Sequence, residues 1–133
     1  MKSAQSNQAA KIATLSERDE CRGLAQIIGR VGDKWTVMVV GHLSESGVMR
    51  FNTLMRAIPG VSHRMLTLTL RALQRDGLVR RTAYATVPPR VDYELTALGR
   101  SLTEPLSMLA EWASTRRSEI ENAQREYDSA PSP

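Results

Sequence analysis

Three arginines in the middle of the chain share one side of a helical pattern and could bind nucleic acid. Arg64, Arg71 and Arg75 fall on one face of a helix that turns by about 100° per residue. The planar guanidinium group bonds through two N–H groups to guanine edges in the major groove of DNA, or to phosphate oxygens. For an isolated helix a solvated surface is the simpler interpretation, so the flanking elements decide whether this stripe recognises DNA.

The opposite side of the same segment is apolar, which indicates a helix packed on a core. Leu66, Leu70 and Leu73 recur at i, i+4 and i+7, the spacing of one buried face. Ser62 precedes the pattern as a helix cap, and Ile58-Pro59-Gly60 ends an earlier helical segment. Two helices joined by a tight turn are therefore predicted, in the order of a helix-turn-helix.

The N-terminal residues of the second helix in this motif make most of the contacts with bases. We therefore expect base contacts from Ser62, His63, Arg64 and Thr67. Leu68 could meet a thymine methyl group, and Arg71 is expected on phosphate. Arg75 lies farther along the helix and is expected to fall outside the groove.

A two-stranded ribbon is predicted directly after this helix. Residues 78–84 and 91–95 have the pattern of strands, the second with clear alternation of apolar and polar side chains. Pro88 and Pro89 cannot donate to a strand ladder, so they belong at the exposed turn. Arg90 would then lie near the tip and touch phosphate or the minor groove. A helix-turn-helix with such a ribbon is the outline of a winged helix, which favours DNA recognition.

Positive charge is concentrated in this part of the chain. Residues 50–100 contain nine arginines, no lysine and three acids, a balance of +6. Residues 1–49 carry six bases and five acids, a balance of +1, and residues 101–133 carry three bases and six acids, a balance of −3. Such a local excess is the electrostatic footprint of a phosphate-binding module.

Helical patterns flank the motif on both sides. Upstream, residues 21–28 and 35–43 are predicted helices, and Asp33 is a cap for the second. Downstream, Thr96 is expected to cap a long terminal helix. Pro105 should kink or divide that helix, because proline removes a backbone donor.

An apolar stripe on the terminal helix predicts self-association. The stripe consists of Leu98, Leu102, Leu106, Leu109, Ala113 and Ile120, with Trp112 beside it. A small domain uses its core to hold its own three helices, so this surplus face is expected to pair with a second copy of the chain. The alternative is that the helix folds back on its own domain. We predict an α+β, mostly helical fold: a winged helix-turn-helix with extra N- and C-terminal dimerisation helices.

Length and composition fit one soluble domain, with 133 residues, 41% hydrophobic and 24% charged content. We assign residues 17–127 to this domain, residues 1–16 to a flexible arm and residues 128–133 to a flexible tail. The chain has no run of about 18 apolar residues and no secretory pattern, so we expect a cytoplasmic protein without a membrane partner. His42 and His63 are the only histidines, and we predict no catalytic residues, metal or cofactor, hence no enzyme.

These residues resemble the HxlR-type winged-helix transcriptional regulators over residues 21–112. The resemblance rests on Cys21 placed fourteen residues before Trp35, Gly32-Asp33-Lys34-Trp35, Arg50-Phe51, Ser62 with Leu66, Leu70 and Leu73, Asp76-Gly77-Leu78-Val79, and Pro88-Pro89-Arg90-Val91-Asp92-Tyr93. The chain departs from the family pattern at Arg22, where proline usually follows the cysteine. It departs again at Asp33, where glycine or a basic residue is common.

The resemblance implies a homodimer, built by the first and last helices, that binds an inverted repeat in double-stranded DNA. It also implies redox or electrophile sensing through Cys21, as in some relatives. A helix N-terminus and Arg22 favour a reactive thiolate, whereas Glu17, Asp19 and Glu20 oppose it. The alternative role of Cys21 is that of a small buried hydrophobe. A single thiol can form a disulfide only with another molecule.

Two further questions stay open in the sequence. Trp35 and Trp112 could border a pocket for a small-molecule effector in the dimer, or they could belong to the core. The arginine stripe could instead bind an acidic partner protein. The chain would then be a winged-helix interaction module without specific DNA binding.

Overall fold

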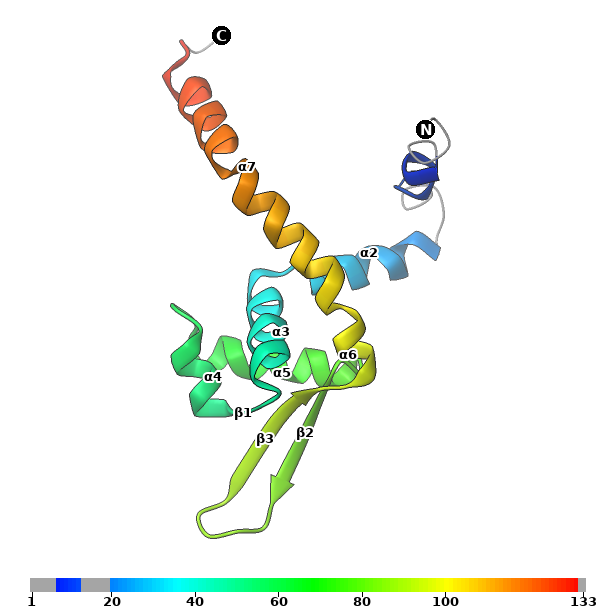
Figure 1. Cartoon of the computed structure of the whole chain (residues 1–133), viewed down its shortest axis with the longest axis vertical. Helices are drawn as coiled ribbons and strands as arrows, with labels where there is room; N and C mark the ends of the chain where they lie inside the picture. Colours follow the sequence, from blue (N-terminus) through cyan, green and yellow to red (C-terminus); the bar gives the residue numbers. More distant parts are fainter. Residues whose placement is uncertain (1–6, 13–19, 132–133) are drawn as a thin grey trace.

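The described part of the chain is mostly helical and contains one small antiparallel sheet (Figure 1). The structure, a computed structural model, describes residues 7–12, which are helical, and residues 20–131. The predicted arm, residues 1–16, therefore lies mostly outside the described residues. The elements are α2 (Glu20–Val31), α3 (Lys34–Ser46), β1 (Val48–Arg50), α4 (Phe51–Ala57), α5 (His63–Arg75), β2 (Val79–Tyr84), β3 (Arg90–Leu95), α6 (Ala97–Ser101) and α7 (Thr103–Ser129).

The core lies between α3, α4, α5 and the sheet. Its most deeply buried side chains on α3 and α5 are at most 1% exposed: Val39, Val40, Leu43, Leu66, Leu70 and Leu73. The Asp33 carboxylate caps α3 as predicted, because it accepts hydrogen bonds from the backbone N–H groups of Trp35 and Thr36 at 3.0 and 3.2 Å. Since one side of α5 is buried in this core, its other side must face solvent.

A tight turn joins α4 to α5 and sets the direction of α5. Gly60 takes a φ of +79° in this turn, a left-handed conformation that residues with a Cβ disfavour. Ser62 then begins α5, and its Oγ accepts a hydrogen bond from the backbone N–H of Met65 at 3.0 Å. The predicted helix-turn-helix is confirmed.

The sheet has the strand order β1-β3-β2, with antiparallel pairing throughout. β2 and β3 form the predicted ribbon, in register from Val79 opposite Leu95 to Tyr84 opposite Arg90. Tyr93 and Leu95 are buried, so one face of the ribbon packs on the helices. The ribbon projects from the body as a wing, on the side opposite to α7 (Figure 1). The sequence pattern does not predict β1, because three residues are too few to show alternation.

The C-terminal segment differs from the prediction of one long helix capped by Thr96. Thr96 caps the short α6 instead, and its Oγ1 accepts a hydrogen bond from a backbone N–H of α6 at 3.0 Å. α7 begins after Leu102, which places Pro105 in the first helical turn, where its missing N–H costs no hydrogen bond. The predicted division is therefore found, and α7 leaves the body as an arm that runs to Ser129, inside the expected tail (Figure 1).

Candidate nucleic-acid interface

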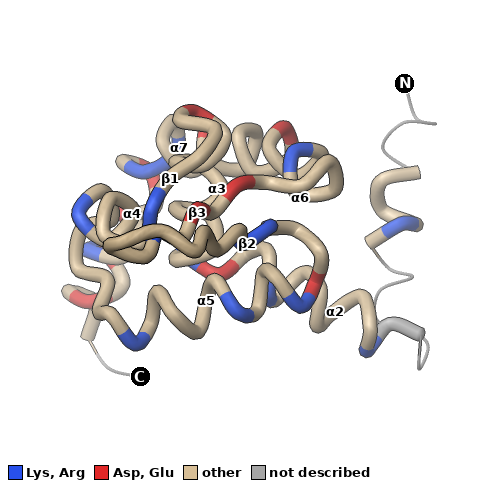
Figure 2. The backbone as a smooth tube through the Cα atoms, turned by 90° about the horizontal axis from the view of Figure 1, so that it is seen from below, with Lys and Arg blue, Asp and Glu red and all other residues tan. Residues whose placement is uncertain are grey.

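The solvent side of α5 carries the arginine stripe, and Figure 2 marks the basic positions along this helix. Arg64, Arg71 and Arg75 are exposed, and the Leu68 side chain between them is 46% exposed. The leucines on the other side of α5 are buried. The predicted orientation of this helix is therefore confirmed, with leucines toward the core and guanidinium groups toward solvent.

Local contacts fix the first turn of α5. The His63 ring packs against Phe51, with ring centres 4.8 Å apart and planes tilted by 53°. Thr67 Oγ1 donates a hydrogen bond to the His63 carbonyl oxygen at 2.8 Å, and Ser62 Oγ accepts the capping hydrogen bond. The hydroxyl groups of Ser62 and Thr67 are thus engaged within the helix. Arg64, with no such contact among the described residues, has the freest donors for a base.

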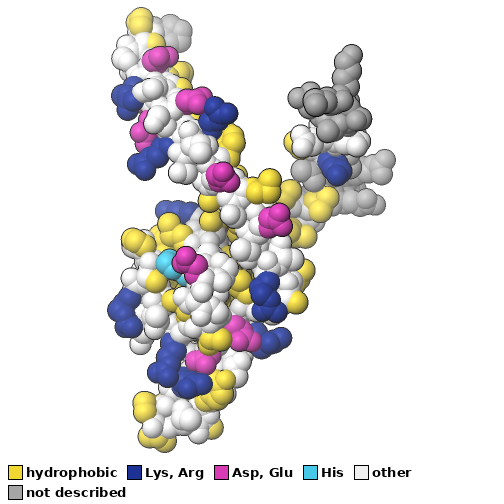
Figure 3. Space-filling model, viewed as in Figure 1, with side chains coloured by type: hydrophobic (Ala, Val, Ile, Leu, Met, Phe, Trp, Pro, Cys, Tyr) yellow, Lys and Arg dark blue, Asp and Glu magenta, His cyan; other side chains and the backbone are white. Residues whose placement is uncertain are grey.

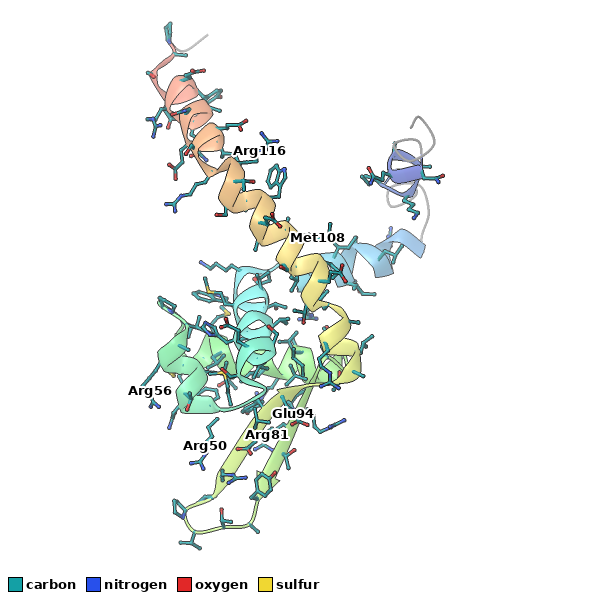
Figure 4. The ribbon with its side chains drawn as sticks, viewed as in Figure 1. Arg50, Arg56, Arg81, Glu94, Met108 and Arg116 are labelled. Carbon is teal, nitrogen blue, oxygen red and sulfur yellow. The ribbon has the colours of Figure 1, made fainter. Side chains whose placement is uncertain are left out.

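A groove between α5 and the wing contains an arginine that the sequence pattern does not select. The groove has a volume of about 470 Å³, and its lining includes Arg71, Gln74 and Arg81. Arg81 lies opposite Tyr93 in the ribbon and so shares the face that Tyr93 turns toward the helices. Figure 4 shows Arg81 on the wing, below the body. The alternation of apolar and polar residues in β3 predicts which β3 side chains face the helices. Which β2 side chains share that face depends on the β2–β3 register, which the sequence does not give.

Each of the three acids between positions 50 and 100 is paired with an arginine outside the α5 stripe. The ion pairs are Arg30 Nε–Asp76 Oδ2 at 2.9 Å, Arg80 Nη1–Glu94 Oε1 at 2.9 Å and Arg90 Nη2–Asp92 Oδ2 at 3.2 Å. Within residues 7–12 and 20–131, no ion pair involves Arg64, Arg71, Arg75 or Arg81. Uncompensated positive charge therefore gathers on α5 and beside the groove.

Arg90 opens β3 and does not extend from the turn of the wing. Its guanidinium lies 4.3 Å from the centre of the Tyr84 ring and pairs with Asp92. These contacts hold Arg90 on the outer face of the ribbon, away from the face that carries Arg81. Arg81 is consequently the better placed of the two wing arginines for a phosphate contact beside α5.

The expected dimerisation stripe divides into a part that packs on its own domain and an exposed part. Leu106 is buried and Leu102 packs against the core, so both hold the C-terminal segment on the body. Leu98, Leu109 and Trp112 are 57%, 51% and 56% exposed. Ala113 and Ile120, the other residues of the stripe on α7, are exposed too. The surface open to a second copy therefore consists of the exposed group, without Leu102 and Leu106.

The predicted effector residues are only partly described. Cys21 lies in α2, but its side chain falls outside the described part of the structure. Trp35 packs against the core, with Lys34 Nζ 4.6 Å from its ring centre, whereas Trp112 is exposed on α7. Core packing thus accounts for Trp35 and not for Trp112, and a small-molecule effector beside them stays a prediction.

In residues 7–12 and 20–131, no group of histidine, cysteine and acidic side chains is arranged to hold a metal ion. Within the same ranges, no helix combines the length and apolar content needed to cross a membrane.

A helix-turn-helix with an exposed arginine face, followed by an antiparallel ribbon, defines a winged-helix DNA-binding protein. Residues 30–121 match the model of the HxlR-like helix-turn-helix family. The chain belongs to this family and is a helix-turn-helix transcriptional regulator.

Individual relatives match along most of their length. The HTH-type transcriptional regulator YtfH of Escherichia coli strain K12 is 40% identical over 95 residues, which cover 71% of this chain and 75% of the relative. The solved structure of ytfH from Salmonella typhimurium is 36% identical with a TM-score of 0.69, covering 77% of this chain and 89% of that chain. The redox regulator HypR in its reduced form is 37% identical with a TM-score of 0.69, covering 75% of this chain and 98% of that chain.

Arg81→Ala is expected to weaken binding to every DNA sequence alike, because Arg81 borders the groove from the wing and lies away from the first turn of α5. We expect a loss of roughly three- to tenfold and a decrease of about one in the slope of log affinity against log salt. Titration of specific and random duplexes at several salt concentrations measures both. Arg80→Ala, on the other face of β2, is the control and should show neither effect. A loss confined to one duplex would assign Arg81 to a base contact instead.

Proposed function

We propose that two copies of the chain bind an inverted-repeat operator in double-stranded DNA, with one α5 helix in the major groove of each half-site. The observation that carries this proposal is the exposed arginine face of α5, which has no ion pair among the described residues. Arg64 lies in the first turn, where base contacts are made. Arg71 and Arg81 border the protein groove between α5 and the wing and suit phosphate contacts.

Exposed apolar residues on α2 and α7 support the dimer. Leu24, Ile27 and Ile28 are 44%, 59% and 49% exposed, and their i, i+3, i+4 spacing places them on one face of α2. Leu109 and Trp112 are similarly exposed on α7, and Figure 3 shows hydrophobic side chains on both arms. Exposed apolar surface of this kind marks interaction sites, and a two-fold partner would cover both arms at once.

Selection of bound sequences from random duplex DNA tests the proposal. The enriched sequences should contain an inverted repeat whose half-sites lie about one helical turn, or a multiple of it, apart. At physiological salt the operator should bind about a thousandfold more tightly than random duplex. Binding without enrichment that disappears as salt rises would contradict the proposal and favour the interaction module.

We further propose that Cys21 makes operator binding sensitive to oxidants or electrophiles. Cys21 is the only cysteine of the chain and lies in the first turn of α2, next to Arg22, where backbone N–H groups and a cation stabilise a thiolate. The likeness to HypR, which is described as a redox regulator, supports this role. Because α2 is a proposed dimer element, modification of Cys21 would act on the arrangement of the two copies.

Diamide treatment is therefore expected to change operator affinity by about fivefold or more, the size of a typical allosteric coupling. Diamide accepts the two electrons and two protons released when two thiols join. Electrophoresis without reductant distinguishes a disulfide between two copies from one with a small thiol. Cys21→Ser should bind the operator as the untreated protein does and should not respond. Equal affinity of treated and untreated protein would assign Cys21 a structural role.

A further inference from the structure

Among the side chains that the structure describes, α2 packs on the body at its C-terminal end. Residues 22–29 are all exposed, whereas Arg30 and Val31 are half-buried, and Val31 packs against the core. A short link of Gly32 and Asp33 then leads into α3. We call the helix-turn-helix of α4 and α5 the reading head. The direction of α2 relative to this reading head therefore depends on the contacts of the last turn of α2.

Arg30, in the last turn of α2, is paired with a residue at the C-terminal end of α5, the helix proposed to read the DNA bases. Arg30 Nε lies 2.9 Å from Asp76 Oδ2, and the two side chains are 38% and 31% exposed. Asp76 is itself fixed as the C-cap of α5, since its backbone N–H donates to the Ala72 carbonyl oxygen at 3.0 Å. The ion pair thus joins α2, a proposed dimer element, directly to α5, which carries the arginine stripe.

A cleft lies between the C-terminal half of α2 and α5. Its volume is about 430 Å³, and its walls include Gln26, Gly29, Met65, Leu68, Thr69 and Ala72. Because open space lies between the two helices here, side-chain packing does not fix their angle along the cleft. The Arg30–Asp76 pair bridges one end of it, so this pair resists a rotation of α2 against α5 together with Val31.

We propose that Arg30 and Asp76 form a positioning pair that sets the angle between α2 and α5, and through it the separation of the two reading helices in the dimer. This inference rests on the proposed homodimer. If α2 is held by the partner copy, a change in the α2–α5 angle moves each reading head relative to the other. Operator spacing would then depend on an ion pair that contacts neither DNA nor the other copy.

Spin-label distances between the two copies test the proposal without DNA. Thr53 is exposed on α4, so a label on Thr53→Cys in a Cys21→Ser background reports the separation of the two heads. Arg30→Gln should broaden or displace the distance distribution. Arg30→Gln should also lower the preference for the natural operator over one with about two inserted base pairs, by about fivefold or more. Arg80→Gln breaks an ion pair of the same length on the wing and should leave both readouts unchanged.

The double substitution Arg30→Asp with Asp76→Arg rebuilds the pair in reverse and should restore the original distribution and spacing preference. Thermal unfolding of each variant checks that the fold is retained. A dimeric Arg30→Gln protein with the original distances and spacing preference would overturn the positioning role alone. A chain that sediments as a monomer would overturn the proposed dimer, and the positioning role with it.

Discussion

Trp112→Glu is expected to convert the homodimer into monomers and to lower operator affinity by about 100-fold or more. Trp112 is 56% exposed on α7, in the apolar surface that the second copy would cover. A carboxylate covered there loses its hydration, a cost that the apolar contacts cannot offset. Each reading head would then bind its half-site alone and lose the effective concentration supplied by the other.

Sedimentation velocity and operator titration of the same variant measure both effects. Ser118→Glu is the matched control, because it adds the same charge to α7 at an exposed position that lies on the opposite side of the helix from Leu109 at about 100° per residue. Ile27→Glu tests the α2 part of the interface and should behave as Trp112→Glu does. A Trp112→Glu protein that remains dimeric and binds the operator normally would place the interface elsewhere.

Arg64→Ala is expected to lower the discrimination between operator and random duplex by about tenfold or more. Arg64 is the second residue of α5, is exposed, and has no ion pair with any residue that the structure describes. A bidentate contact with a base stabilises only the matching sequence. Its loss should therefore affect the operator far more than random DNA.

Arg75→Ala provides a control of the same residue type on the same face of α5. Arg75 is the last residue of the helix, so we expect a small loss that is equal for the two duplexes. Competition titration at physiological salt gives the affinity ratio for each variant. If Arg64→Ala kept the ratio of the unsubstituted protein, or if Arg75→Ala reduced it as much, α5 would not read bases with its first turn.

The pairing of acids explains how a chain with a net charge of only +4 can present a strongly basic face. Asp76, Asp92 and Glu94 each pair with an arginine that does not belong to the α5 stripe. On α7, Glu119 and Glu121 pair with Arg116 and Arg117 of the same helix. Glu121 raises the pKa of Arg117 through the hydrogen bond that it accepts and then through its charge. Figure 2 shows the basic positions along α5.

The sequence predicts α5 and the wing because their signals are local. Ser62, the preceding turn and the leucine spacing all lie within or beside one helix, and each supports the same element. Pro88 and Pro89 leave few places for the turn of the ribbon, so the two strands follow with bounds close to those observed.

The features that the sequence does not predict depend on contacts between distant elements. β1 is defined by pairing with β3, in which Val48 lies opposite Glu94, and Arg81 reaches the groove only through the β2–β3 register. Leu106 and Leu109 belong to one periodic stripe, yet the first is buried and the second exposed. Only the place where α7 leaves α3 decides between these two environments, and no local pattern records it.

Titration of a selected inverted repeat against the same duplex with one half-site scrambled, at physiological salt, tests the proposed function most directly. Fluorescence anisotropy gives the affinity, and sedimentation of the complex gives the number of chains bound. We predict that two copies bind the intact operator and that scrambling one half-site lowers the affinity by about 100-fold or more. Equal affinity for the two duplexes would contradict recognition of an inverted repeat by a pair of α5 helices.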